Sequence, residues 1–154
     1  MKLNTKEIGR IKAVSTSDTK GVKKVNNTSA NLVENYGLTG DAHAGKWHRQ
    51  VSLLADESIE KMRYKGIDVT AGDFAENITT EGLQLWSLPV GYRFKIGENT
   101  LLEITQIGKK CHQGCAIFQQ IGECVMPKEG VFARVLKGGA IRPGDPILTV
   151  PADQ

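Results

Sequence analysis

Short apolar segments separated by glycine-containing turns run along most of the chain, and this spacing limits the folds available to it. Such segments lie at 8–14, 50–54, 92–96, 100–107 and 146–150, and the chain contains 17 glycines. Segments of this length with alternating apolar residues are typical of strands, and glycine supplies the tight turns between them. A parallel α/β sheet would need a helix after each strand. The sequence therefore predicts a mainly β fold, a barrel with a few short helices.

Two short helices and one hairpin are expected within this pattern. Asp56 can cap a helix whose apolar face carries Ile59 and Met62, and Gly66 can end it. A second helix is predicted over 131–136, between Gly130 and the next glycine pair. The hairpin joins 92–96 to 100–107 through a turn at 97–99.

Length and charge place the chain among small domains with small ligands. Its 154 residues predict a single domain over 1–154, and 20 basic against 17 acidic residues leave a net charge of +3. This charge is too small to indicate a nucleic acid partner, but it is compatible with a small anion. No apolar run is long enough for a membrane helix or a signal peptide. Three clustered cysteines are typical of a reducing compartment, so we expect a cytoplasmic protein.

The chemically most reactive segment is 108–117, which follows the predicted strand 101–107. It contains Lys109, Cys111, His112 and Cys115, and Cys124 lies nine positions further on. Nearby cations favour the thiolate, the form that attacks electrophiles, carries sulfur or binds a soft metal. The alternative is that these cysteines are small buried hydrophobic residues. Zinc is disfavoured, because the adjacent Cys111 and His112 are awkward as joint ligands.

A glycine-rich loop at 37–49 provides a second candidate site. Its glycines allow successive backbone N–H groups to point into one concavity, and His43, Lys46, His48 and Arg49 add donors or positive charge. These features suit a phosphate. The alternative is an ordinary surface loop with a hydrogen-bonded Asp41 and solvated histidines.

Two further segments offer weaker candidates. Asp73, Glu76 and Asn77 precede a predicted strand, where they serve either as an acid–base pair or as turn caps. Arg134 carries a planar guanidinium that matches phosphate or carboxylate, although an exposed surface position explains it equally well.

Taken together, several of these segments resemble the MOSC family, which is named for the C-terminal domain of molybdenum cofactor sulfurase. The resemblance is carried by Gly40-Asp41-Ala42-His43-Ala44-Gly45 and by the segments 48–54, 72–78, 88–91, 110–117, 130–136 and 141–145, and it spans nearly the whole chain. It implies a MOSC-type β-barrel and a role in molybdenum cofactor or sulfur chemistry centred on one cysteine.

The resemblance also implies a set of site residues. Larger members of the family carry two cysteines separated by two residues, of which the second binds molybdenum; here three residues separate the pair. We align Cys115 with the metal ligand and keep Cys111 as the alternative catalytic thiol. The predicted contacts of the molybdopterin ligand are Gly40, Asp41, His43, His48, Arg49, Asn77, Lys109, His112 and Arg134.

Three functions follow from this resemblance. The first is a molybdenum cofactor-binding protein with a cysteine thiolate on molybdenum, acting in oxidoreductase chemistry or in cofactor handling. The second is a sulfur carrier that holds a cysteine persulfide for cofactor or metal–sulfur cluster maturation, with a cysteine desulfurase or a molybdoenzyme as partner. The third is a cofactor carrier without turnover, so whether the chain is an enzyme stays open.

Overall fold

The structure of the chain, a computed structural model, describes residues 5–20, 22–108 and 126–151. Its elements in chain order are β1 (Glu7–Thr16), β2 (Val25–Asn27), β3 (Ala30–Val33), β4 (Gly37–Leu38), β5 (Val51–Ala55), α1 (Asp56–Tyr64), β6 (Ile78–Glu81), the 3-10 helix η1 (Leu85–Ser87), β7 (Arg93–Ile96), β8 (Thr100–Ile107), α3 (Met126–Glu129), β9 (Val131–Lys137), β10 (Gly139–Ile141) and β11 (Pro146–Thr149).

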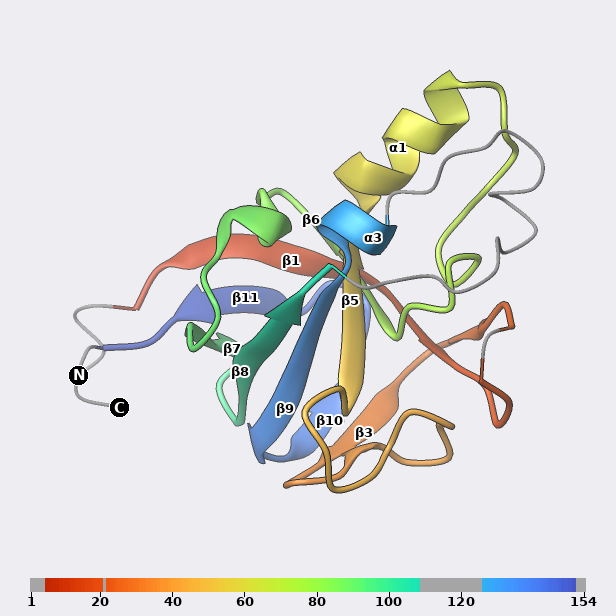
Figure 1. Cartoon of the computed structure of the whole chain (residues 1–154). Coiled ribbons are helices and arrows are strands. Elements are labelled where there is room, and N and C mark those ends of the chain that lie inside the picture. Colours follow the sequence, from red (N-terminus) through yellow and green to blue (C-terminus); the bar gives the residue numbers. More distant parts are fainter. Residues whose placement is uncertain (1–4, 21, 109–125, 152–154) are drawn as a thin grey trace.

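Seven of the described strands close a barrel, in the order β11-β7-β8-β9-β5-β6-β1, with β1 pairing back to β11. Neighbouring strands are antiparallel except for β5 and β6, which run parallel. A small sheet of β10, β3 and β4 lies at one end of the barrel, and α1 projects from the other end (Figure 1). The predicted mainly β barrel is confirmed.

Two apolar cores explain why these segments fold as they do. Along β5, Val51, Leu53 and Ala55 point into the barrel, whereas Leu54 points outward. Outward-facing Leu54 packs with Phe132 of β9 against the apolar face of α1, which presents Ile59 and Met62. The helix therefore covers the outside of β5 and β9 at one end.

The helix predicted over 131–136 is wrong, because this segment forms strand β9. Val131, Ala133 and Val135 face the barrel interior, and Phe132 faces the second core under α1. A strand that is buried on both faces loses the alternation that distinguishes it from a helix. The short helix at this place is α3, which precedes β9.

The helix predicted from Asp56 is confirmed as α1, with one difference at its start. Asp56 is its first residue and makes no capping bond; its carboxylate instead binds Lys12 at 2.7 Å and Arg63 at 3.0 Å. Gly66 follows the helix with a φ of 93°, a conformation that glycine adopts without strain. No helix among the described residues is long and apolar enough to cross a membrane.

Candidate functional site

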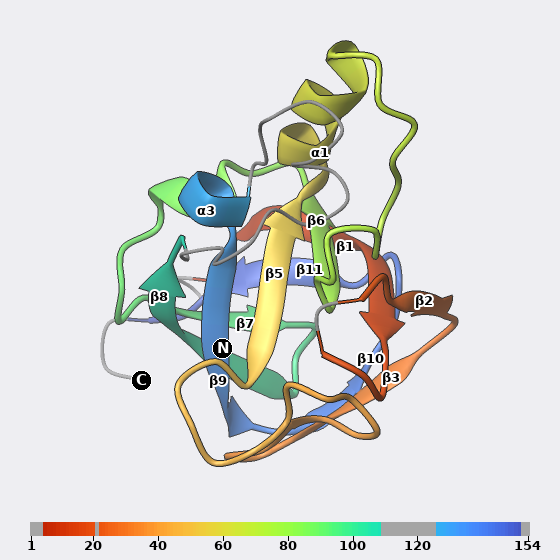
Figure 2. The same cartoon turned by 45° about the vertical axis from the view of Figure 1, so that its right-hand side comes forward.

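We call residues 109–125 the cysteine segment. The residues on either side of it lie close together, at one end of β8 and β9. Residues 109–125, which include Lys109, Cys111, His112, Cys115 and Cys124, lie outside the described residues. Before them, Gly108 donates its N–H to Gly130 O at 2.6 Å, and Ile107 pairs with Val131. After them, Glu129 of α3 accepts hydrogen bonds from Ser58 at 2.5 Å and Lys61 at 2.7 Å of α1. The flanking residues, Gly108 and those of α3, thus lie where β8, β9 and α1 meet (Figure 2).

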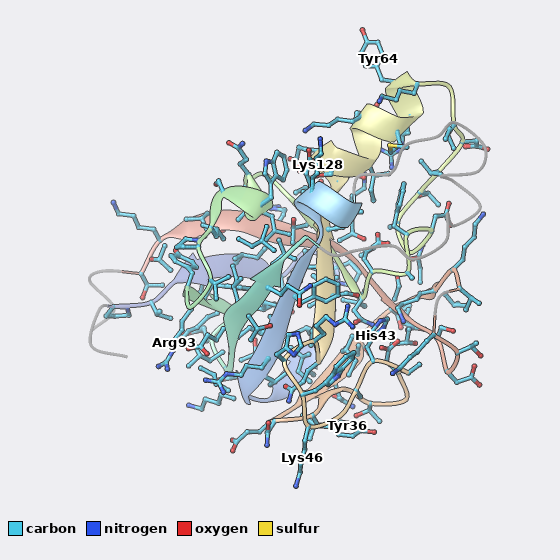
Figure 3. The ribbon with its side chains drawn as sticks, in the orientation of Figure 1. Tyr36, His43, Lys46, Tyr64, Arg93 and Lys128 are labelled. Atoms are coloured by element: carbon cyan, nitrogen blue, oxygen red, sulfur yellow. The ribbon has the colours of Figure 1, made fainter. Side chains whose placement is uncertain are left out.

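A group of cationic and imidazole side chains surrounds Trp47, in the loop between β4 and β5. We call Lys20, His43, Trp47, His48 and Arg49 the Trp47 cluster. The His43 ring stacks on Trp47 with a centroid distance of 6.4 Å, and His48 meets it edge-on at 5.8 Å. The charged groups of Lys20 and Arg49 lie 5.0 and 4.8 Å from the ring centroid. Figure 3 shows His43 and Lys46 on this loop.

Two buried nitrogens of this cluster have no hydrogen-bond partner among the described residues: Nε of Arg49 and Nδ1 of His43. The Arg49 guanidinium lies against two aromatic rings, those of Trp47 and Phe132, the latter at 5.4 Å. Buried polar atoms without partners are rare in folded proteins, and one explanation is a group that binds there. His43 Nδ1 still lies 3.7 Å from Asp41 Oδ2, so it is Arg49 Nε that offers a free donor for an anion.

Asp41 organises the backbone of this loop from inside. Its carboxylate is fully buried, pairs with the equally buried Lys24 at 2.9 Å, and accepts the backbone N–H groups of Ser17 and His43. Burial alone would raise the pKa of Asp41, but the His43 ring, the Lys24 ammonium and these N–H groups bring it well below its ordinary value. Gly40 precedes it with a φ of 81°. Asp41 therefore holds the loop and presents no free oxygen.

A hydrogen-bonded chain connects the cluster to the start of the cysteine segment. Gln106 donates from Nε2 to Gly108 O at 2.8 Å, so its Oε1 faces His48 Nε2 at 2.9 Å. Because Oε1 can only accept, neutral His48 must carry its proton on Nε2. Thr105 adds a hydrogen bond to the His48 carbonyl. Gln106 was not among the predicted site residues; its place at the end of an alternating strand was the available signal.

A cavity of about 530 Å³ opens beside Trp47, and we call it the Glu103 pocket. It is lined by Asn35, Lys46, Trp47, His48, Val90, Gly91, Glu103, Ile104, Thr105 and Arg134. Arg134, a predicted cofactor contact, already pairs with Glu103 at 2.7 Å. Burial would raise the pKa of Glu103, but Arg93 and Arg134 hold it below its ordinary value. The sequence analysis did not single out Glu103, although the hairpin places it opposite Arg93.

Asn77 uses its side chain inside the barrel wall. Its Oδ1 accepts from the backbone N–H and the hydroxyl of Ser52, and its Nδ2 donates to Ser15 O. Asn77 thereby joins β1 to β5. The neighbouring Glu76 is also buried, which raises the pKa of its carboxyl, and it accepts bonds from Gly72, Phe74 and Thr79. Both side chains hold the turn in place.

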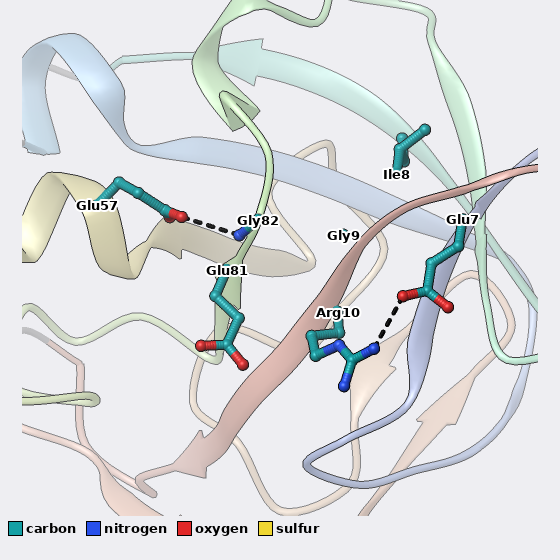
Figure 4. A pocket seen from close by; sticks show the side chains of 7 residues that line it. All are labelled: Glu7, Ile8, Gly9, Arg10, Glu57, Glu81 and Gly82. Carbon is teal, nitrogen blue, oxygen red and sulfur yellow. Dashed lines mark hydrogen bonds and ion pairs between the residues drawn. The ribbon is translucent and has the colours of Figure 1, made fainter.

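A second cavity, of about 500 Å³, lies between β1 and the end of β6 (Figure 4). Three glutamates line it, Glu7, Glu57 and Glu81, beside Arg10. Arg10 is held by Glu7 at 3.0 Å, and Glu57 accepts the N–H of Gly82 at 2.8 Å. An acidic lining of this kind does not suit a phosphate. Among the described residues, no group of three or more His, Cys, Asp or Glu side chains could hold a metal ion.

Comparisons with known proteins show the family and the fold of this chain. Residues 40–148 match the model of the MOSC domain, a span that includes the Trp47 loop and the cysteine segment. The fold is similar to the YuaD protein from Bacillus subtilis, with a TM-score of 0.78 and 18% identity, covering 94% of this chain and 96% of that one.

Two further solved structures share the fold at similar identity. YiiM from Geobacillus stearothermophilus has a TM-score of 0.64 and 21% identity, with 96% of this chain and 75% of that chain covered. YiiM from Escherichia coli has a TM-score of 0.64 and 20% identity, with 93% and 69% covered. A sequence search of curated proteins found no match. The family model spans most of the barrel and both candidate loops, and the chain therefore belongs to the MOSC domain family.

Proposed function

We propose that this protein binds a molybdenum cofactor through the Trp47 cluster and the cysteine segment. The observation that carries the proposal is the cluster itself, in which the buried Nε of Arg49 has no hydrogen-bond partner among the described residues. Hydrogen bonds from His48 to Gln106 and from Gln106 to Gly108 connect the cluster to the residue that precedes the cysteine segment. Association with molybdenum cofactor is also common in the MOSC family.

The donor set fits the two ends of such a cofactor. Lys20, His43 and Arg49 supply cations and N–H donors for a pterin phosphate, with no carboxylate within ion-pair distance of Lys20 or Arg49 in the described part of the chain. The Cys115 thiolate, favoured by Lys109 and His112, is the soft ligand for molybdenum, with Cys111 as the alternative. When bound, the cofactor supplies two-electron redox chemistry. Asp41 and Asn77 hold the surrounding backbone in this proposal.

Metal analysis of the protein tests the proposal directly. The full chain, produced in a host that synthesises the cofactor, should contain molybdenum near one equivalent together with the pterin. Protein without molybdenum that also fails to bind added cofactor would reject the proposal.

The alternative function is sulfur carriage, which the cations beside the thiols in the sequence favour. A donor persulfide would transfer its sulfane sulfur to the thiolate of Cys115 or Cys111 and be released as a thiol. After incubation with a cysteine desulfurase and cysteine, one peptide should gain roughly 32 Da, the mass of a persulfide sulfur. An unmodified peptide would count against this function.

Three cysteine variants separate the roles of the thiols. Cys115→Ser removes the soft donor at similar volume, so molybdenum binding or persulfide formation should disappear while the circular dichroism spectrum is unchanged. Cys111→Ser should reduce the same property without abolishing it, and Cys124→Ser should have a mild effect. A fully active Cys115→Ser beside an inactive, folded Cys111→Ser would transfer the role to Cys111.

A further inference from the structure

Three charged side chains lie side by side on three neighbouring strands, and two of them, Glu103 and Arg134, line the Glu103 pocket. Glu103 of β8 is directly opposite Arg93 of β7 on one side and Arg134 of β9 on the other. Arg93 Nε lies 3.0 Å from one carboxylate oxygen, and Arg134 binds the second oxygen through Nε at 2.8 Å and a terminal nitrogen at 2.7 Å. The carboxylate therefore engages both guanidinium groups.

These contacts change what Arg134 can offer to a ligand. A guanidinium grips a phosphate best with two parallel N–H donors, and here Nε and one terminal nitrogen already bind Glu103. Glu103 also places a negative charge inside the pocket, next to Lys46 and Arg134. Arg49 differs, because no carboxylate of the described residues lies within ion-pair distance of it and its Nε has no partner. Arg134 is thus already engaged by a carboxylate, whereas Arg49 has a free donor for a ligand.

The rest of the pocket is suited to an organic molecule. Val90, which is 61% exposed, and the Trp47 ring supply an apolar rim, and Thr105 and Asn35 add polar groups. An anion with several charges would gain little from the apolar rim, and Glu103 would offset part of its attraction to Lys46 and Arg134. A neutral or singly charged molecule would meet neither cost.

We infer that Glu103 sets the charge selectivity of this pocket, which admits small neutral or singly charged organic molecules and disfavours multiply charged anions. In this inference, phosphate groups bind at the neighbouring Trp47 cluster. The identification of the pocket's ligand as a substrate rests on the proposed function, whereas the charge selectivity does not depend on molybdenum.

Inorganic pyrophosphate is a suitable probe, because it carries several charges and no apolar part. Its dissociation constant is measured by calorimetry at low ionic strength with the full chain, without any cofactor, and every protein in the series carries Arg49→Ala to weaken phosphate binding at the Trp47 cluster. Glu103→Gln keeps the size of the side chain but frees Arg134, and it should tighten pyrophosphate binding about tenfold, as expected for one added charge-assisted hydrogen bond. Glu81→Gln, in the acidic cavity beside β6, removes the same charge elsewhere and should change binding less than about twofold, because exposed charges are screened.

Arg134→Gln, made both with Glu103 intact and in the Glu103→Gln protein, shows whether Arg134 is the source of the tighter pyrophosphate binding. In the Glu103→Gln protein it should remove the tenfold gain, and with Glu103 intact it should weaken binding only about two- to threefold, because Arg134 is already engaged. Unchanged affinity in Glu103→Gln, or an equal cost of Arg134→Gln in both backgrounds, would overturn the inference. Neither result bears on whether molybdenum binds, so failure here is distinct from failure of the proposed function.

Discussion

At the scale of single residues, the same side-chain type has different roles depending on its partners. Arg49 and Arg134 are equivalent candidates in the sequence, but Arg134 binds Glu103, whereas Arg49 lies against two aromatic rings and its buried Nε has no partner in the described part of the chain. The predicted contacts also differ in exposure: Asp41 is buried against Lys24, whereas His48 is exposed at the Glu103 pocket. Availability for a ligand is therefore set by what each group already binds.

The two arginines should respond differently to substitution. Arg49→Ala should weaken retention of the cofactor about ten- to a hundredfold, since it removes a charge-assisted bond worth about 1.5–3 kcal/mol. Arg134→Ala should weaken it less than about tenfold, because its guanidinium is held by Glu103. Molybdenum content after dialysis measures both. Equal losses in the two variants would mean that both arginines contact the phosphate.

The buried Lys24–Asp41 pair should make stability depend on pH. The pKa of folded Asp41 lies below its unfolded value, so its contribution is complete above about pH 4, the unfolded pKa, and is lost as the pH falls through the folded pKa. Asp41→Asn should cost about 3–5 kcal/mol at neutral pH, because it leaves Lys24 buried without a counter-charge.

Urea denaturation between pH 7 and pH 3 measures this dependence. The difference in unfolding free energy between the native sequence and Asp41→Asn should shrink as the pH falls. Glu7→Gln, which breaks the exposed pair with Arg10, serves as the control and should cost less than about 1 kcal/mol. A difference that stays constant over this range would argue against ionised Asp41 as its source.

At the scale of elements, the loop before β6 is held against β1 and β2 by a close backbone approach. Gly72 has a φ of 91°, and a Cβ there would lie 2.5 Å from Lys24 O and 3.2 Å from Ser15 Oγ. Gly66, at the end of α1, has nearly the same φ of 93°, but a Cβ there would meet nothing within 4 Å. The two glycines share a conformation and differ in their surroundings.

Alanine at these two positions separates conformational strain from steric overlap. Gly66→Ala should cost about 1 kcal/mol, the price of a left-handed conformation for a residue with a Cβ. Gly72→Ala should cost at least about 2–3 kcal/mol, since strand β2 must also move. Thermal and urea unfolding of both variants measures the difference. Equal costs would show that the loop moves away without penalty.

At the scale of the whole molecule, the barrel joins segments that are distant in sequence. Strand β1 pairs with β6 and with β11, so the chain is closed by contacts between its first and last strands. Because each barrel strand has two neighbours, the loss of one strand exposes the edges of two others. Local loss of a single barrel strand is therefore unfavourable.

Unfolding should accordingly be a single transition. Trp47 reports on the outer loop, and Trp86, which packs against the barrel core, reports on the interior. Fluorescence of Trp86→Phe and Trp47→Phe should therefore give the same urea midpoint as far-ultraviolet circular dichroism of each variant. An earlier midpoint for the Trp47 signal would show that the loop opens independently of the barrel.

Much of the strand pattern was predictable, because one face of most strands meets solvent. The hairpin 92–96 to 100–107 corresponds to β7 and β8, and the segment 146–150 corresponds to β11. Strand β9 was not predictable, since Val131 and Phe132 are buried on opposite faces and leave no alternation. The local pattern fails where tertiary contacts cover both sides.

For the candidate site, the sequence indicated the basic loop at 37–49 but not the contacts among its residues. His43, His48 and Arg49 are close together in the chain, and the structure brings them around Trp47. Asn77, by contrast, is used entirely within the barrel wall. The roles of Cys115, Cys111, Lys109 and His112 remain predictions, because these residues lie outside the described part of the chain.

The sequence by itself determined the β-barrel class, the position of α1 and the basic loop, since these depend on local periodicity, turn residues and charge. Only the tertiary structure decided that Glu103 holds Arg134, that Lys24 neutralises Asp41 and that Gln106 connects His48 to Gly108. Apart from Gln106 and Gly108, the partners in each pair come from different strands or loops. Charge and hydrogen-bonding capacity alone do not reveal which partner a residue will meet. Closure of the barrel brings the partners together.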